Sequence, residues 1–320
     1  MSGGRVLVTG AAGQDGGYLV ERLLAQGREV HALVRDAAAP LPPDVVRHVG
    51  DVRDPDLFPA LLRRCRPAVV HHLAGLSSVA TSWQQPALAA EVNGLSAVRL
   101  LEACSRAEHV PRVVLACSAE VFAASRTSPQ SEDTPLAPAS PYGASKATAL
   151  LSARVHRAAG LPVSAALLYN HESPRRPMSF LSAKVVAGAV AAAAGNPDPL
   201  RLGNLDAVRD WGWAPDHVDA VLRMTDGPPD DYVVATGNGR TVRDFVAATF
   251  AAVGLPRWQE HVVVDEAFVR PADAAVLVGD ASRAREVLGW RPAVGFDELV
   301  LRLVRARQGP PDSPGRAARP

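Results

Sequence analysis

The chain has 320 residues with a formal net charge of +1, and 48% of its residues are hydrophobic. This composition supplies enough apolar side chains for the core of one large domain or two smaller ones. The nearly balanced charge argues against a protein that binds nucleic acid or an anionic membrane. Because the sequence shows no charged leader with an apolar run and no long apolar span, we expect neither a signal peptide nor a transmembrane helix.

The cysteines, at positions 65, 104 and 117, are scattered without the spacing of a metal site. They predict reduced thiols in a cytoplasmic protein. The neighbouring His71 and His72 end a predicted strand and have no partner at ligand spacing. We therefore predict no metal centre.

Strand-like apolar runs alternate with helical patterns through the first half of the chain. Strands are predicted near 5–9, 29–34, 45–49, 68–73, 112–116 and 163–168. Helices are predicted near 16–26, 55–65, 86–106 and 140–159. These repeated units predict an α/β fold with a doubly wound parallel sheet of the Rossmann type and right-handed crossovers.

The second half of the chain is less regular. Its helices are predicted near 179–194, 242–253 and 297–305. We assign residues 1–168 to the sheet domain and residues 169–307 mainly to a smaller substrate domain, which packs partly back on the sheet. The tail at 308–320 is rich in Pro, Gly, Arg and Ala and is predicted to be disordered.

A glycine-rich turn follows the first predicted strand, which ends at Thr9. Gly10, Gly13 and Gly16 have the spacing G-x-x-G-x-x-G, and a helical pattern begins directly after them. Glycine allows positive φ and lets a ligand come close to the backbone, and the first N–H groups of a helix attract an anion. Strand, turn and helix together predict a site for the pyrophosphate of a dinucleotide.

The residues after the second strand indicate which dinucleotide binds. Val34 stands nearest the position where an acidic residue would bind the ribose 2′-hydroxyl of NAD, and Arg35 follows it. An arginine there suits a 2′-phosphate and favours NADP. The alternative is that Arg35 is a solvated loop residue and Asp36 binds the ribose of NAD. Asp51, just after the third strand, is placed to reach the adenine amino group.

A pair of chemically active side chains lies at the start of the helix near 140–159. Ser140 is suited to cap this helix and Pro141 to its first position. Tyr142 and Lys146 are four residues apart and share one face. An ammonium close to a phenol lowers the pKa of the phenol, so we expect Tyr142 to act as a base near neutral pH.

These motifs resemble those of the extended short-chain dehydrogenase/reductase family, and the resemblance covers about residues 5–305. It implies that Tyr142 acts as acid and base at a substrate hydroxyl and that Lys146 also holds the nicotinamide ribose. It implies further that Ser118, after the fifth strand, hydrogen-bonds the same hydroxyl.

Within that family the chain is most similar to the GDP-mannose 4,6-dehydratases. The similar stretches are 13–19, 170–176, 202–212 and 268–273. The likeness implies a lyase that makes a nucleotide-linked 4-keto-6-deoxy sugar by internal hydride transfer through bound NADP, with Glu120 as the base at carbon 5. It places the nucleotide diphosphate on Asn170, Lys184, Arg209 and Arg270, with Arg175 and Arg176 left open as a solvated face. It places the cofactor on Gly10, Gly13, Gln14, Asp15, Gly16, Arg35, Asp51, Val52, Leu73, Tyr142, Lys146 and His171.

The chain also departs from the dehydratase pattern. Ala119 stands where the pattern has a serine, Ser78 where it has a histidine, and Ala267 where it has an arginine. Guanine and mannose specificity therefore stay open. A sugar-nucleotide 4-epimerase or 4-ketoreductase is the alternative, since neither needs a carbon-5 base, and a non-catalytic NADP-binding protein is a further one.

The resemblance also bears on assembly. In the family, helices that correspond to 86–106 and 140–159 pair across a two-fold axis. Both stretches are rich in alanine and leucine here, and we expect a homodimer. The dehydratases form tetramers through the loop after the second strand, which is short in this chain between Asp36 and Val45.

Overall fold

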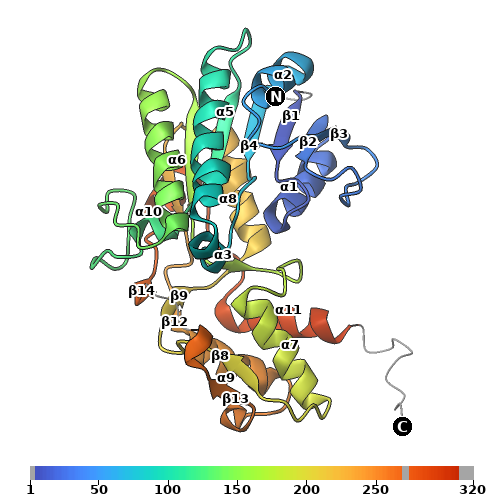
Figure 1. The fold of residues 1–320 in the computed structure, drawn as a ribbon, viewed down its shortest axis with the longest axis vertical. Coiled ribbons are helices and arrows are strands. Elements are labelled where there is room, and N and C mark those ends of the chain that lie inside the picture. Colours follow the sequence, from blue (N-terminus) through green and yellow to red (C-terminus); the bar gives the residue numbers. More distant parts are fainter. Residues whose placement is uncertain (1–3, 269–273, 310–320) are drawn as a thin grey trace.

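The computed structural model describes residues 4–268 and 274–309. Its larger part, at the top of Figure 1, is the upper lobe, and it is built on a sheet of seven parallel strands. They are β1 (Val6–Thr9), β2 (Val30–Val34), β3 (Val46–Val49), β4 (Val69–His72), β5 (Arg112–Ser118), β6 (Val163–Leu168) and β11 (Asp231–Val234). Their order across the sheet is β11-β6-β5-β4-β1-β2-β3, so the chain starts inside the sheet and winds outward to both edges. The predicted α/β class and doubly wound parallel sheet are confirmed.

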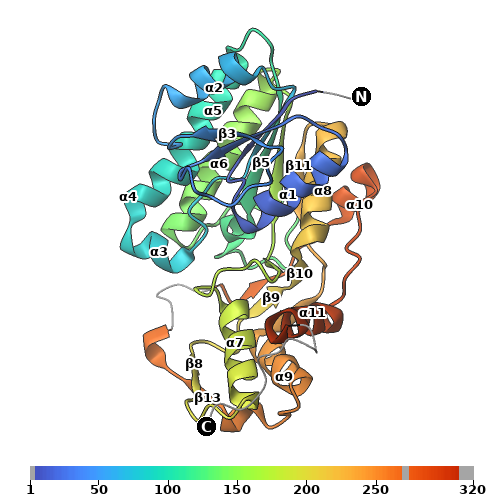
Figure 2. The same cartoon turned by 90° about the vertical axis from the view of Figure 1, so that its right-hand side faces the viewer.

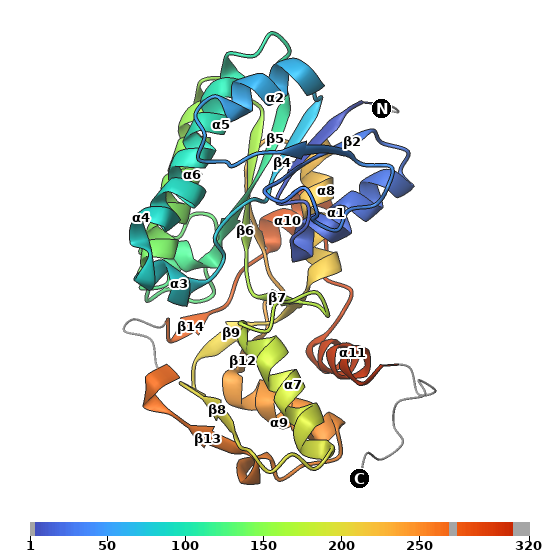
Figure 3. The same ribbon diagram turned by 45° about the vertical axis from the view of Figure 1, so that its right-hand side comes forward.

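Helices cover both faces of this sheet (Figure 3). One face carries α2 (Leu57–Cys65), α5 (Ser96–Ser105) and α6 (Pro141–Ala158), and the other carries α1 (Gln14–Ala25), α8 (Ala214–Asp226) and α10 (Ser282–Leu288). Parallel strands covered on both faces need apolar side chains on both. Accordingly β1, β2 and β6 are buried at every position.

The helix predicted near 86–106 contains a wider turn. After the short helix α3 (Val79–Gln84), it runs through α4 (Pro86–Ala89), the π-helical turn η1 (Ala90–Leu95) and α5. Hydrophobic periodicity does not reveal such a turn, because the apolar face continues through it. π-Turns within helices occur mostly at functional sites.

Besides the short α3 and the turn η2 (Ala119–Phe122), the sequence analysis missed α8, α10 and β11 of the upper lobe, which lie in the half expected to be irregular. Residues of α8, α10 and β11 lie in the same apolar core as β5 and β6. Strand β11 has only four residues and begins with an aspartate, so it gives no strand signal by itself. The upper lobe is therefore completed by chain from the second half of the sequence.

The smaller lobe lies below the carboxyl edge of the sheet (Figure 2). It contains α7 (Leu181–Ala193), α9 (Val242–Ala252), α11 (Phe296–Gln308), the pair β8 (Leu200–Leu202) and β13 (Val262–Val264), and the short helices η3 (Trp258–Glu260) and η4 (Glu266–Phe268). Between the lobes lie the pair β7 (His171–Glu172) and β10 (Gly212–Trp213) and the sheet of β12 (Gly239–Thr241), β9 (Val208–Asp210) and β14 (Val276–Leu277). The core of the smaller lobe is separate, and Trp211 stacks on Phe245 there with ring centroids 4.6 Å apart.

The end of the chain was predicted to be disordered from residue 308. Gln308 instead closes α11, and residues 310–320 lie outside the described part of the chain. Among the described residues, no helix has the length and apolarity needed to cross a membrane.

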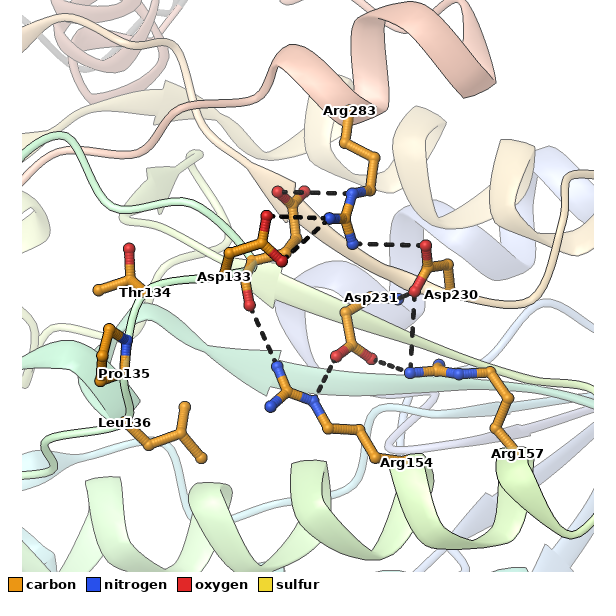
Figure 4. Close-up of a pocket in the computed structure, with 10 residues that line it drawn as sticks. Asp133, Thr134, Pro135, Leu136, Arg154, Arg157, Asp230, Asp231 and Arg283 are labelled. Carbon is orange, nitrogen blue, oxygen red and sulfur yellow. Dashed lines mark hydrogen bonds and ion pairs between the residues drawn. The ribbon is translucent and has the colours of Figure 1, made fainter.

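An ionic cluster ties α6 to β11 and to α10 around a hollow of about 460 Å³ (Figure 4). Arg154 and Arg157 of α6 both pair with Asp231, at 2.6 and 2.7 Å. Arg283 of α10 pairs with Asp230 at 3.3 Å. The side chain of Asp231 is 5% exposed, whereas that of Asp230 is 45% exposed. These pairs fasten the last strand of the sheet to helices on both faces.

We expect Asp231→Asn to lower the free energy of unfolding by about 1.5–3 kcal/mol, because the buried carboxylate accepts charge-assisted hydrogen bonds from both Arg154 and Arg157 that an amide cannot replace. Asp230→Asn is the matched control and should change it by less than about 1 kcal/mol, since exposed pairs contribute little. Urea unfolding of both variants measures the difference, and equal losses would contradict the structural role of Asp231.

Candidate active site

The glycine turn after β1 leaves no room for side chains. A Cβ on Gly10, whose φ is 70°, would lie 2.7 Å from the Ala74 nitrogen. A Cβ on Gly16 would lie 2.2 Å from the Gly10 carbonyl oxygen. Gly13 caps α1 with extended backbone and no side-chain bond. The turn therefore brings bare backbone to the start of α1, an arrangement that fits the pyrophosphate of a dinucleotide.

The two residues that open α1 bind the segment after β6. Asp15 Oδ2 lies 2.9 Å from His171 Nε2, and Gln14 Nε2 donates to the His171 carbonyl at 3.1 Å. Ser173 Oγ donates to Gln14 Oε1 at 2.8 Å. Of these, Gln14, Asp15 and His171 were predicted to bind the cofactor, and the structure shows them joining the glycine turn to β7.

The Asp15–His171 contact shifts the pKa of both groups. Burial by itself would raise the pKa of Asp15, but the charge and hydrogen bond of His171 outweigh it and hold that pKa at about 2. Burial would lower the pKa of His171, but Asp15 outweighs it and raises that pKa above the ordinary 6.5. The contact therefore favours the charged form of both groups.

Charged side chains gather where β2 and β3 end, at the place predicted for the adenosine half of the cofactor. Arg35 follows β2 and is exposed. Asp51 follows β3, and hydrogen bonds from Arg53, as close as 2.6 Å, lower its pKa to about 2, with a smaller contribution from the charge of Arg35. Val52 is buried beside them. The structure thus brings Arg35 near Asp51 and also adds Arg53, which the sequence analysis did not single out.

The predicted catalytic residues meet at the carboxyl edge of β5. Ser118 ends β5 and accepts a hydrogen bond from the Glu120 N–H at 3.2 Å. Glu120 lies in the 3₁₀ turn η2 (Ala119–Phe122). A Cβ on Gly143 would lie 2.6 Å from the Glu120 carbonyl oxygen, so only glycine lets α6 start this close to η2. Ser140 caps α6 by accepting from the Gly143 N–H at 3.0 Å, as predicted.

Burial dominates the acid–base properties of Tyr142 and Lys146. It raises the pKa of Tyr142 to about 12, while a hydrogen bond with Ser118 and the charge of Arg176 act in the lowering direction. Burial lowers the pKa of Lys146, whose Nζ donates to the Ala116 carbonyl at 2.8 Å. The predicted lowering of the Tyr142 pKa by Lys146 is therefore wrong for this structure, because the sequence argument omitted desolvation.

Asn93 is a site residue that the sequence analysis missed. It lies in the π-turn η1, accepts from the Leu76 N–H at 2.8 Å, and donates to the Leu76 carbonyl and to Ser145 Oγ. It thereby fixes the segment after β4 against the turn of α6 between Tyr142 and Lys146. Asparagine is a poor residue for a helix interior, and its place within the helix predicted near 86–106 was the sequence feature that could have singled it out.

Arg176 does not lie on a solvated face, and it is close enough to the predicted catalytic residues for its charge to act on Tyr142. It is ion-paired with Glu172 at 3.0 Å, and its side chain is 14% exposed. It lies over the Phe180 ring at 4.2 Å from the centroid, and its charge acts on Tyr142. Arg175 faces outward, pairs with Glu21 and covers the Tyr18 ring.

The residues predicted to hold the nucleotide diphosphate are distributed around the smaller lobe. The Asn170 carbonyl accepts from Gly212 at 2.8 Å. Lys184 on α7 donates to the Arg201 carbonyl at 2.6 Å and lies over the Phe268 ring. Arg209 on β9 is buried and donates to the Ala274 carbonyl at 2.7 Å. Arg270 lies outside the described residues.

The sheet, the glycine turn and the Ser118–Tyr142–Lys146 group define an extended short-chain dehydrogenase/reductase. A family model described as GDP-mannose 4,6 dehydratase matches residues 7–303, and the chain belongs to this family. GDP-mannose 4,6 dehydratase 1 of Arabidopsis thaliana is 40% identical over 93% of this chain and 88% of its own length. The predicted family and the predicted enzyme class, a hydro-lyase, are confirmed.

Solved structures extend the likeness to the whole fold. The UDP-glucose 4-epimerase of Thermus thermophilus, in complex with NAD, has a TM-score of 0.84 and 32% identity, with 95% of this chain and 99% of that chain covered. DesIV, a dTDP-glucose 4,6-dehydratase from Streptomyces venezuelae with NAD bound, has a TM-score of 0.84 and 28% identity, with 95% and 97% covered. Epimerases and dehydratases thus share this scaffold, and the fold does not separate them.

We expect Asp15→Asn to destabilise the protein in a pH-dependent way. Because the pKa of His171 is raised above 6.5 in the folded state, the stabilisation is complete below that value and is lost as pH rises through the folded pKa. The difference in unfolding free energy between wild type and Asp15→Asn should therefore shrink on the alkaline side.

Urea unfolding at a series of pH values from mildly acidic to alkaline measures this difference. Glu21→Gln, on the same helix and in an exposed pair with Arg175, is the control and should give a small, flat difference. A difference for Asp15→Asn that stays constant or grows with pH would contradict the assignment.

Proposed function

We propose that the protein is a 4,6-dehydratase that converts GDP-mannose or a related GDP-sugar to its 4-keto-6-deoxy form with bound NADP. The family supports the reaction type. The observation that carries the proposal is the position of Glu120, in the turn between Ser118 and the segment that leads to Tyr142. A 4-epimerase or 4-ketoreductase has no step that requires a carboxylate there.

The residues of the upper lobe fit a nicotinamide dinucleotide. Bare backbone at Gly10 and Gly16 suits its pyrophosphate, and the buried ammonium of Lys146 suits its ribose. A Cβ on Gly75 would lie 2.9 Å from Asn93 Oδ1 and 3.5 Å from Lys146 Nζ, so the segment after β4 also runs as bare backbone beside this group. The nicotinamide held there would supply reversible hydride transfer with no net change in the cofactor.

The side chains at the carboxyl edge of β5 carry out the proton transfers of the proposed reaction. Burial raises the pKa of Tyr142 and keeps its phenol protonated in the protein alone, and the positive charge of an oxidised nicotinamide beside Lys146 would oppose that shift. Tyr142 in its phenolate form takes the proton of the sugar 4-hydroxyl, and Ser118 orients that hydroxyl through a hydrogen bond. The resulting ketone acidifies the proton on carbon 5. Glu120 removes this proton and passes it to the 6-hydroxyl, which leaves as water. When hydride returns to carbon 6, carbon 5 takes up a proton that has exchanged with solvent. Proton transfers by positioned groups of this kind contribute about 10²–10⁴ to a rate.

Ala119, the departure next to Glu120, is compatible with this assignment. It is 3% exposed and packs in the apolar core with Val121 and Phe122. Ser78, another departure, caps α3 by accepting from the Thr81 N–H at 3.1 Å. Both residues therefore have structural places of their own, and the Ser118, Glu120 and Tyr142 group is complete without them.

We expect Glu120→Gln to pass hydride to NADP⁺ but not to eliminate water, because an amide cannot accept the carbon-5 proton. A single-turnover assay with GDP-mannose should show NADPH absorbance that persists, with deoxy-sugar formation slower by roughly two to four orders of magnitude. Glu286→Gln, exposed on α10, is the matched control and should behave as wild type. Deoxy-sugar formation by Glu120→Gln at the wild-type rate would favour an epimerase or reductase.

NADP is proposed over NAD on the basis of Arg35, which stands exposed near Asp51. Arg35→Ala should weaken NADP binding about ten- to a hundredfold and leave NAD binding nearly unchanged, because only NADP carries a 2′-phosphate. Isothermal titration with both cofactors measures the ratio, and Arg63→Ala, exposed on α2, is the control. Equal losses for NADP and NAD would remove Arg35 from this role.

A homodimer is proposed from the outer face of α5 and α6, which none of the described elements covers in Figure 1. Leu95, which ends η1 just before α5, is 42% exposed, and Leu151 and Val155 of α6 are 49% and 67% exposed. Val155→Glu should convert the dimer to monomer in light scattering, because an uncompensated charge would enter an apolar interface. Val264→Glu is the matched control, since Val264 is 58% exposed on β13 of the smaller lobe. A monomeric wild type would contradict the proposal.

A further inference from the structure

A cluster of metal-ligand atoms lies at the edge of the sheet, outside the catalytic site. It consists of His31 on β2, His48 on β3 and Cys65, the last residue of α2. His31 Nδ1 is 2.9 Å from His48 Nε2, and His48 Nε2 is 3.4 Å from Cys65 Sγ. The three ligand atoms lie within 4.8 Å of one another, and all three side chains are buried.

The strand register explains why these side chains converge. β2 and β3 are parallel, with His31 opposite Val46 and Leu33 opposite His48. The two histidines are therefore two positions apart on adjacent strands and point to the same face of the sheet. α2 ends over that face, so Cys65 reaches the same point.

β3 depends on this cluster for its attachment. It is the edge strand, and Val46, Arg47 and Val49 are exposed, so His48 is its one buried residue. An apolar side chain is the ordinary choice for such an anchor. A histidine whose ring nitrogen faces another imidazole and a thiol instead brings together the ligand types that zinc prefers.

Glu29 orients the first of these ligands. Its Oε1 lies 3.0 Å from His31 Nε2, which places the proton on Nε2 and leaves the lone pair of Nδ1 directed at His48. A carboxylate behind a histidine is the usual support of a metal-binding imidazole. When His48 Nε2 carries the proton donated to His31 Nδ1, the Cys65 sulfur beside it is left as a weak acceptor only. A cation satisfies all three ligand atoms at once.

We propose that His31, His48 and Cys65 bind one Zn²⁺ ion. Tetrahedral zinc with ordinary bond lengths places two nitrogens about 3.3 Å apart and a nitrogen and a sulfur about 3.5 Å apart. The observed 2.9 and 3.4 Å are a few tenths of an ångström shorter than these values, and the third pair, His31 and Cys65, lies within 4.8 Å. The fourth position is available to water.

The site fastens the edge strand that leads to the cofactor. Asp51, with its Arg53 partner, follows His48 by three residues, so an ion at His48 fixes the start of the segment predicted to contact adenine. The absence of a metal site was predicted from spacing along the chain. His31, His48 and Cys65 are separated by 17 residues each and come from three elements, so no compact motif reveals them.

The test is a titration of the full-length, chelator-treated protein with Co²⁺, a spectroscopic substitute for zinc. Wild type should bind one Co²⁺ per chain, with visible bands of tetrahedral cobalt and a near-ultraviolet thiolate-to-cobalt charge-transfer band. Zn²⁺ should displace the cobalt and raise the Tm by several degrees, because it binds only the folded protein. A wild type with no saturable Co²⁺ binding would overturn the proposal, and this result does not depend on any variant.

Variants then assign the ligands. Cys65→Ser should abolish the charge-transfer band, and Glu29→Gln should weaken Co²⁺ binding about tenfold, the usual effect of removing a supporting carboxylate. Cys104→Ser is the matched control, because Cys104 is equally buried on α5 but outside the cluster. Circular dichroism confirms that each variant folds. A charge-transfer band retained in Cys65→Ser, or lost in Cys104→Ser, would contradict the assignment.

Discussion

The buried ammonium of Lys146 is the interaction on which the catalytic end of the molecule depends. Its Nζ donates to the Ala116 carbonyl at 2.8 Å, and the side chain is only 7% exposed. A buried charge is costly unless polar groups surround it. The fold supplies the Ala116 carbonyl by placing α6 against β5 two residues before Ser118. A shift of the helix that carries Tyr142 would therefore break this hydrogen bond to a buried charge.

Two further constraints set the positions around this point. Gly143 allows α6 to begin against the Glu120 carbonyl, which holds the proposed carbon-5 base next to the proposed hydroxyl base. The Asp15–His171 contact joins the glycine turn to β7, so the dinucleotide turn and the segment leading to the smaller lobe move together. The two lobes are thus tied at the same edge of the sheet where the reactive side chains gather.

The sequence predicted what local patterns determine. The strand, turn and helix at Gly10–Gly16, the Ser140 cap and the six strands of the first half are all visible as periodicity or as residue types with one physical use. β11 was missed because four residues beginning with Asp231 acquire strand character only by pairing with β6. The pKa of Tyr142 was misjudged because burial is a property of the packed molecule. The contacts of His48 and Asn93 escaped for a similar reason, since their partners lie on other elements.

The central claim is dehydration of a GDP-sugar with carbon 5 as the site of proton removal. The most direct measurement is mass spectrometry of the product formed by wild-type protein from GDP-mannose and NADP in deuterated water. The account predicts a product that has lost one water, retains the nucleotide diphosphate and carries solvent deuterium at carbon 5, with no net consumption of NADP. An isomer of unchanged mass without deuterium at carbon 5, or turnover that requires stoichiometric NADPH, would contradict it.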